Sequence, residues 1–383
     1  MVEQEPTTEP EEQAPEAQEE PPRPLLVLRD GLPPLTDSPA ALAEACAAIG
    51  AGSGPVAIDA ERASGYRYSS RAYLIQLRRE GSGTWLVDPI PLETLAPLAE
   101  ALEGTEWILH AATQDLPCLA EVGLRPGSLF DTELAGRLLG YPRVGLATLV
   151  ETVVGKRMKK EHSAVDWSRR PLPEPWLEYA ALDVEVLVEL RDALAAQLVE
   201  AGKDEWARQE FEALLSFEFA ARVDAWRRTS GMHRVRTRRG LAAVKGFHGR
   251  GAERYASRWV AALREAAALE EADLPARAPR TEGPPLPRAW ADRDPVAARR
   301  LALARTALGE AAERHSLPVE NMLTPDYLRR VLWTPPATRD AAALAAAVDA
   351  ALHDLGARPW QVELTGPVIT QAILGADEPP EPS

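Results

Sequence analysis

The stretch Pro55-Val56-Ala57-Ile58-Asp59-Ala60-Glu61 decides how the rest of the chain is interpreted. Val56, Ala57 and Ile58 are typical of a buried β-strand, and two acids then stand where the apolar run would continue. Alternate residues of a strand share a face, so Asp59 and Glu61 point to the same side. Two neighbouring carboxylates at the end of an apolar strand repel each other and resist desolvation. A divalent cation would remove this conflict, although an acidic pair surrounded by solvent is the simpler alternative.

The composition places the negative charge of the chain mostly at its start. The chain has 383 residues, enough for two or three domains, and a net charge of −15. Its first 22 residues hold eight Glu and no Lys or Arg, so we expect a disordered acidic tail over residues 1–23. The tail has neither the basic start nor the apolar centre of a targeting peptide. Because no run of about 18 apolar residues occurs, we expect a cytoplasmic protein without a membrane partner.

Hydrophobic patterns after Pro24 predict an α/β domain over residues 24–203. A helix at 40–49 precedes three strands, expected at 55–61, 71–78 and 84–89 as an antiparallel meander. Further elements are expected at 92–102 (helix), 106–111 (strand), 114–122 (helix), 128–131 (strand) and 174–200 (helix). A meander followed by alternating strands and helices predicts a mixed β-sheet of the ribonuclease H type.

Two further acids stand out against their surroundings. Asp115 lies in the first turn of the helix expected at 114–122, where the positive end of the helix dipole alone would favour it. Asp183 falls within the apolar stripe of the helix expected at 174–200, with Tyr179 four residues earlier on the same face. A carboxylate in a buried stripe must be paired, protonated or bound to a metal. An Arg or a backbone N–H that satisfies Asp183 is the alternative to a metal.

Together these stretches resemble the three exonuclease motifs of the DEDD superfamily, in its tyrosine subclass. The motifs are Asp-x-Glu on a strand, an Asp in His110-Ala-Ala-Thr-Gln-Asp115-Leu, and Tyr179-x-x-x-Asp183 on a late helix. The segment Lys160-Glu-His-Ser-Ala-Val-Asp-Trp-Ser-Arg-Arg-Pro-Leu-Pro is similar to bacterial ribonuclease D. The resemblance spans residues 24–202. One departure is that Ala60 and Arg62 stand where many relatives have Thr and Phe, but neither is a ligand position.

The resemblance implies a 3′→5′ exonuclease domain that hydrolyses RNA from a free 3′ end and releases nucleoside 5′-monophosphates. It implies tRNA precursors as partners and two divalent cations, Mg²⁺ or Mn²⁺, as cofactors. The implied metal ligands are Asp59, Glu61, Asp115 and Asp183, which are also catalytic together with Tyr179. Four acids without a Cys/His cluster fit Mg²⁺ better than zinc, and two such ions supply what phosphodiester hydrolysis needs.

Tyr179 is expected to orient the attacking water, because the unperturbed pKa of a Tyr hydroxyl is about 10. We expect substrate contacts from His110 and Lys160. More generally, Lys156, Lys159, Lys160, Arg169 and Arg170 flank the late helix, and each has either a strand-guiding or a structural role. No nucleotide cofactor is expected, and we expect the chain to act as a monomer.

The remainder of the chain is expected to be helical. Residues 204–273 form a shortened, basic module, because Trp226-Arg-Arg-Thr-Ser-Gly-Met-His resembles the start of the HRDC domain shared by RecQ-type helicases and ribonuclease D. A Pro-rich linker is expected at 274–293, then a second HRDC-like domain at 294–375 with Asp294 as its N-cap, and a disordered tail at 376–383.

Between Arg222 and Arg258 there are eleven Lys or Arg against two acids. So concentrated a basic region in an acidic chain favours phosphate contacts over a merely solvated helix face. The expected contacts include Arg234, Arg236, Arg238 and Arg239.

Two other functions compete with the exoribonuclease. A DNA-directed 3′→5′ exonuclease would use the same acids, since they do not distinguish ribose from deoxyribose. An RNA-binding scaffold without nuclease activity is disfavoured, because all four acids and the Tyr are present.

Overall fold

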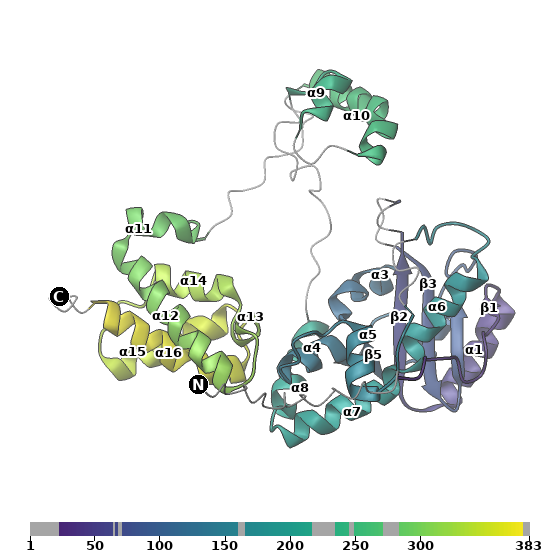
Figure 1. The fold of residues 1–383 in the computed structure, drawn as a ribbon, viewed down its shortest axis with the longest axis horizontal. Coiled ribbons are helices and arrows are strands. Elements are labelled where there is room, and N and C mark those ends of the chain that lie inside the picture. Colours follow the sequence, from purple (N-terminus) through teal and green to yellow (C-terminus); the bar gives the residue numbers. More distant parts are fainter. Residues whose placement is uncertain are drawn as a thin grey trace, which may run out of the picture. The chain divides into compact units, whose positions relative to one another are not determined.

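The computed structural model describes residues 23–63, 66–67, 71–159, 165–216, 234–244, 249–270 and 283–377 (Figure 1). The chain divides into two compact units. The first comprises the residues up to Ser216 together with those from Arg299 onward, and the second comprises Phe217–Ala298.

A mixed sheet of six strands forms the centre of the first unit, in the order β1-β4-β3-β2-β5-β6. Its strands are β1 (Leu35–Thr36), β2 (Ser53–Arg62), β3 (Ala72–Glu80), β4 (Gly83–Val87), β5 (Glu106–Leu109) and β6 (Ser128–Asp131). The strands β2, β3 and β4 are antiparallel, whereas β5 pairs parallel to β2 and β6 parallel to β5. This confirms the predicted mixed α/β fold. The sequence patterns missed β1, a two-residue strand that pairs parallel to β4.

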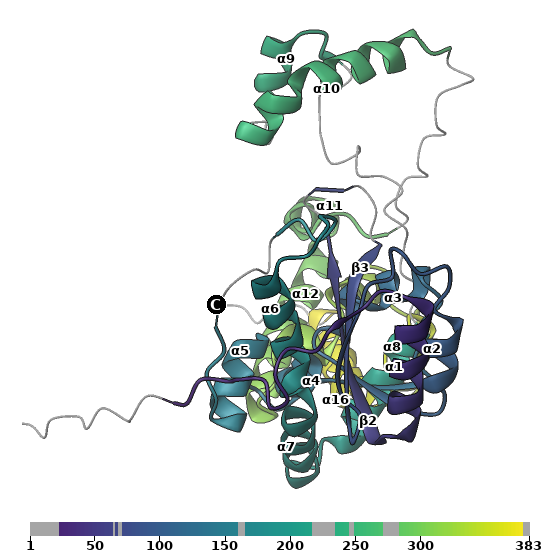
Figure 2. The ribbon, with the colours of Figure 1, turned by 90° about the vertical axis from the view of Figure 1, so that its right-hand side faces the viewer.

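Helices cover both faces of this sheet. On one face lie α1 (Pro39–Ala51), α2 (Ala96–Ala101) and α3 (Leu116–Glu121), and on the other lies α6 (Glu174–Glu185) (Figure 2). The unit also contains η1 (Ala112–Gln114), α4 (Thr132–Leu138), α5 (Leu146–Leu149), the π turn η2 (Val150–Val154) and α7 (Leu187–Glu200). The helix expected at 92–102 is shorter than predicted, because it begins at Ala96 with Pro97 in its first turn.

The prediction of a single helix at 174–200 is wrong. The helix is interrupted at Val186, which has φ −112° and ψ −5° and separates α6 from α7. The last residue of α6, Glu185, is buried and pairs with Arg78 at 3.1 Å and Arg29 at 3.2 Å. These ion pairs fix the end of α6 on the sheet, and the β-branched Val184 and Val186 weaken helix formation at the break.

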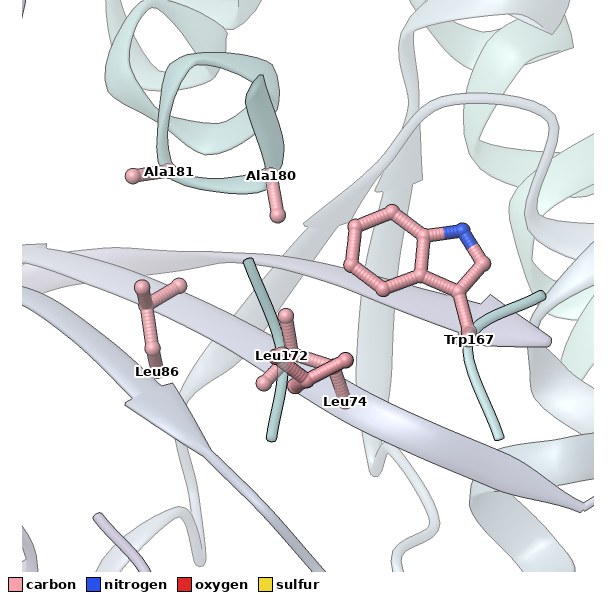
Figure 3. Close-up of a cluster of buried hydrophobic side chains, with 6 residues drawn as sticks. All are labelled: Leu74, Leu86, Trp167, Leu172, Ala180 and Ala181. Atoms are coloured by element: carbon pink, nitrogen blue, oxygen red, sulfur yellow. The ribbon is translucent and has the colours of Figure 1, made fainter. Parts of the chain in front are cut away.

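A cluster of small and large apolar side chains fixes α6 against the sheet (Figure 3). The cluster consists of Leu74 of β3, Leu86 of β4, Ala180 and Ala181 of α6, and Trp167 and Leu172 of the preceding loop. Because alanine side chains are short, α6 can approach the strands closely. This approach brings the polar residues of α6 to the end of β2.

The first unit continues with α8 (Asp204–Leu215) and with the C-terminal helices α12 (Pro295–Arg314), α13 (Val319–Met322), α14 (Pro325–Trp333), α15 (Ala341–Asp354) and α16 (Pro359–Asp377). The division between the units falls within α12. The Ala297 N–H donates to Asp294 Oδ1 at 2.9 Å, which confirms the predicted N-cap. The last helix runs to Asp377 and so extends past residue 375. The helix α8 ends at Leu215, and residues 217–233 lie outside the described part.

Contacts between α8 and α16 join the exonuclease part of the first unit to its C-terminal helices. The rings of Trp206 and Trp360 stack with centroids 4.9 Å apart. Glu210 accepts hydrogen bonds from Arg358 Nη2 at 2.6 Å and from Trp360 Nε1 at 3.0 Å. Thus α8, which the sequence assigned to the basic module, packs within the first unit.

The second unit contains α9 (Arg238–Ala242), α10 (Arg250–Ala268), η6 (Pro287–Ala289) and α11 (Trp290–Arg293). Its described core is small and consists of Val235, Leu241, Ala256 and Val260. Residues 287–293, expected to be linker, are helical. The buried Trp290 anchors them, since its Nε1 donates to Pro285 O. Among all described helices, none is both long and apolar enough to cross a membrane.

Candidate active site

Three of the predicted metal ligands meet at the end of β2. Asp59 and Glu61 lie on β2, and Asp183 lies on α6. One carboxylate oxygen of each lies within 4.8 Å of those of the other two. The alternation of strand residues therefore places both β2 acids on one face, which is the face that α6 covers.

Asp115 reaches the same region from the turn that follows β5. Ala111 has φ +60°, and the chain then passes through η1 to Asp115, immediately before α3. The Asp115 side chain makes no capping hydrogen bond to α3. It lies 3.6 Å from Arg62 Nη2 instead, and Arg62 Nη1 donates to Gln114 O at 2.6 Å. Asp115 thus stands at the N-cap of α3, where the helix dipole still favours a negative charge, but its side chain faces Arg62 and does not cap the helix.

Electrostatics couple the four acids. Burial raises the pKa of Asp115 and of Asp183 well above the usual value, and the charge of Asp59 raises each further. Burial also raises the pKa of Glu61, followed by the charges of Asp59, Asp183 and Asp115. Arg62 acts in the opposite direction on Asp59, Glu61 and Asp115. Such crowded carboxylates can hold oxygen-ligated divalent cations, whose charge would relieve the repulsion.

Tyr179 belongs to this cluster through Asp183. The Tyr179 hydroxyl donates a hydrogen bond to the Asp183 carboxylate, which lowers the pKa of Asp183. Burial and the charge of Asp183 both raise the pKa of Tyr179 above its ordinary value. The hydroxyl therefore keeps its proton at neutral pH and can orient a neighbouring group, but it cannot serve as a free base.

The residues predicted to contact the substrate lie in different environments. His110 Nδ1 lies 2.9 Å from Thr132 Oγ1, and burial lowers the pKa of His110 to about 4, so its ring is neutral at pH 7. Lys160 lies outside the described residues. Arg170 pairs with Asp88 at 2.6 Å, which favours the structural alternative for that residue. The four predicted phosphate contacts in the second unit are exposed: Arg234, Arg236, Arg238 and Arg239.

Asp131, which no sequence pattern singled out, holds the turn that leads to Asp115. Its carboxylate accepts from the backbone N–H groups of Ala111 at 3.1 Å and Ala112 at 2.8 Å. It also accepts from Glu133 and Leu134, and so caps α4. An Asp directly before a helical pattern is a recognisable N-cap signal. The hydrogen bonds that Asp131 accepts from Ala111 and Ala112 cannot be recognised from the sequence around it.

Comparison with known families finds two matched regions. The family described as "3'-5' exonuclease" matches residues 35–199, and the family described as "3' to 5' exonuclease C-terminal domain" matches residues 283–373. Ribonuclease D of Nitrobacter hamburgensis is 41% identical over 111 residues, which are 28% of this chain and 29% of that protein. The chain belongs to the ribonuclease D family. It spans about half or less of the length of the curated ribonucleases D that it matches.

Solved structures extend the likeness over most of the chain. A protein from Bifidobacterium adolescentis is 33% identical with a TM-score of 0.76, and the match covers 92% of this chain and 99% of that one. Escherichia coli RNase D, described as an exoribonuclease involved in structured RNA processing, is 22% identical with a TM-score of 0.56. That match covers 84% of this chain and 98% of the other, and it shows a shared fold. The region matched by the 3'-5' exonuclease family, residues 35–199, contains all four acids.

Proposed function

We propose that this chain is a metal-dependent 3′→5′ exoribonuclease that releases nucleoside 5′-monophosphates from RNA. The observation that carries the proposal is the convergence of Asp59, Glu61 and Asp183, whose oxygens lie within 4.8 Å of one another. Asp115 is coupled to them through its charge. Carboxylates grouped in this way repel one another, and bound cations would offset the repulsion.

Each residue then has a role. Asp59, Glu61 and Asp183 would hold one divalent cation, Mg²⁺ or Mn²⁺, and Asp115 would help to hold a second. When bound, the two cations would activate water and neutralise the charge that develops on the phosphate. Tyr179 would orient that water through its hydroxyl, which the hydrogen bond to Asp183 fixes in place.

The substrate class follows from the family and from the basic second unit. We propose RNA with a free 3′ end, in particular tRNA precursors, and we expect a cytoplasmic monomer. The E. coli relative is described as acting in structured RNA processing, which supports RNA over DNA. Exposed arginines around α9 would contact phosphates, which need positive charge more than a particular base sequence.

The catalytic test uses RNA labelled at its 5′ end, so that removal of residues from the 3′ end gives a ladder. We expect degradation with Mn²⁺ or Mg²⁺, none in EDTA, and almost none with Asp59→Asn. Asp192→Asn is the matched control, because this side chain is 61% exposed on α7. Equal cleavage of DNA would favour the DNA-directed alternative. Robust degradation by Asp59→Asn would contradict the metal site, and RNA binding without cleavage would favour the scaffold.

The RNA-contact test replaces the four predicted phosphate contacts, Arg234, Arg236, Arg238 and Arg239, by Ser. If each neutralises one phosphate of a single strand, the slope of log binding constant against log salt should fall by about 3. The control removes two exposed arginines of α12, Arg305 and Arg314. A slope that the four substitutions leave unchanged would identify the basic region as a solvated surface.

A further inference from the structure

Gln76 of β3 is a buried amide without a hydrogen-bond partner. Its exposed fraction is 0%, and among the described residues neither Nε2 nor Oε1 has a partner. A buried polar group that makes no hydrogen bond costs folding free energy, because it loses its contacts with water. An apolar residue of the same size would avoid this cost, so the position calls for a functional explanation.

The register of the sheet places Gln76 next to the candidate metal site. Gln76 is the direct cross-strand partner of Asp59 on β2 and of Leu86 on β4. Directly opposed residues of antiparallel strands have side chains on the same face, with Cβ atoms about 5 Å apart. Leu86 packs beneath Ala180 and Ala181 of α6 (Figure 3). Gln76 therefore lies between Leu86 and Asp59, on the face that α6 covers.

The other neighbours of Gln76 on this face do not account for a polar side chain. Along β3, Leu74 is apolar and belongs to the cluster under α6. On the other side, Arg78 Nη1 is already engaged by Glu185 at 3.1 Å and by Thr84 at 2.6 Å. Asp59 is the acid that stands directly opposite the amide.

We propose that Gln76 is a positioning residue for Asp59. Without a cation the amide makes no hydrogen bond among the described residues. When a cation is bound, Nε2–H would donate to one carboxylate oxygen of Asp59 and so leave the other oxygen for the cation. This inference rests on the proposed function, since it assigns Asp59 to a metal site. Carboxylate ligands of metals are commonly held by hydrogen bonds of this kind, and loss of the partner typically weakens metal binding about 10- to 100-fold.

The test compares metal affinity with stability in the full-length protein. Gln76→Met keeps the length of the side chain but removes the amide. We expect it to weaken Mn²⁺ binding about 10- to 100-fold by calorimetry. We also expect a higher melting temperature in EDTA, because the unpartnered amide is gone. A residue with a packing role alone would not shift the two measurements in opposite directions.

Thr370→Val is the matched control. Thr370 is a buried residue of α16 whose Oγ1 also has no partner among the described residues. This substitution should raise the melting temperature and leave Mn²⁺ affinity unchanged. Gln76→Leu serves as a second apolar variant if Gln76→Met does not fold. Wild-type Mn²⁺ affinity in either Gln76 variant would overturn the inference, whereas a wild-type protein that binds no Mn²⁺ would overturn the proposed function itself.

Discussion

Replacement of Arg62 by Gln should tighten the binding of a divalent cation at Asp115. Arg62 Nη2 lies 3.6 Å from Asp115 Oδ1, so the guanidinium and a cation compete for the same carboxylate. Two unit charges at this distance attract by about 5 kcal/mol at an effective dielectric constant of about 20, and by about 1 kcal/mol in water. The Arg62 side chain is 26% exposed, so we place the competition near 2 kcal/mol, an order-of-magnitude value.

A loss of about 2 kcal/mol of competition corresponds to roughly 30-fold tighter binding. The assay is calorimetric titration of the full-length protein with Mn²⁺ at low ionic strength, where surface screening is weak. Arg79→Gln is the control for the change in net charge, because Arg79 donates to Ile49 O and Gly54 O near the other end of β2. Unchanged or weaker Mn²⁺ binding by the Arg62→Gln protein would refute the reasoning.

Three further predictions follow from buried polar groups. Burial raises the pKa of Asp183 in the folded protein above the value of 3.8 that it has when unfolded. The contribution of Asp183 to stability is therefore fully present below pH 3.8 and is lost as the pH rises through the folded-state pKa. Asp183→Asn should therefore raise the melting temperature in EDTA at neutral pH, and an unchanged value by scanning calorimetry would contradict this sign. Tyr179→Phe should lower the single-turnover rate about 10²- to 10⁴-fold without weakening Mn²⁺ binding, and equal loss of both would indicate a structural role. Glu210→Ala should cost about 3 kcal/mol in denaturant unfolding, because half-buried Arg358 loses its carboxylate partner and the Nε1 of buried Trp360 loses its acceptor; a cost near zero would show that the α8–α16 contact is weak.

The parts of the site that depend on the spacing of residues along one strand or one helix could be predicted from the sequence. Asp59 and Glu61 share a face because strand residues alternate, and Tyr179 and Asp183 share one because they are four apart on a helix. The turn that carries Asp115 was also predictable as a strand that leads into a helix. These relations depend on neighbours in the sequence, and the fold preserves them.

The contacts that the sequence could not reveal join residues far apart in the chain. Arg62 was set aside because it is not a ligand position, yet it pairs with Asp115. At the break at Val186, Glu185 pairs with the distant Arg78. The apolar periodicity of the sequence continues through this position, so it gave no sign of the break. The strand β1 pairs with β4 and has only two residues, which are too few for a recognisable alternation.

The contact between α8 and α16 has a consequence for the topology of the chain. It closes a loop around residues 217–298, so the first unit is discontinuous and the second unit is an insertion within it. The entropy cost of closing a loop rises only with the logarithm of its length. The insertion can therefore grow, shrink or be exchanged at little cost to the first unit. A single peptide-bond cleavage inside it would leave two fragments that Trp206, Glu210 and Trp360 still hold together without a covalent link.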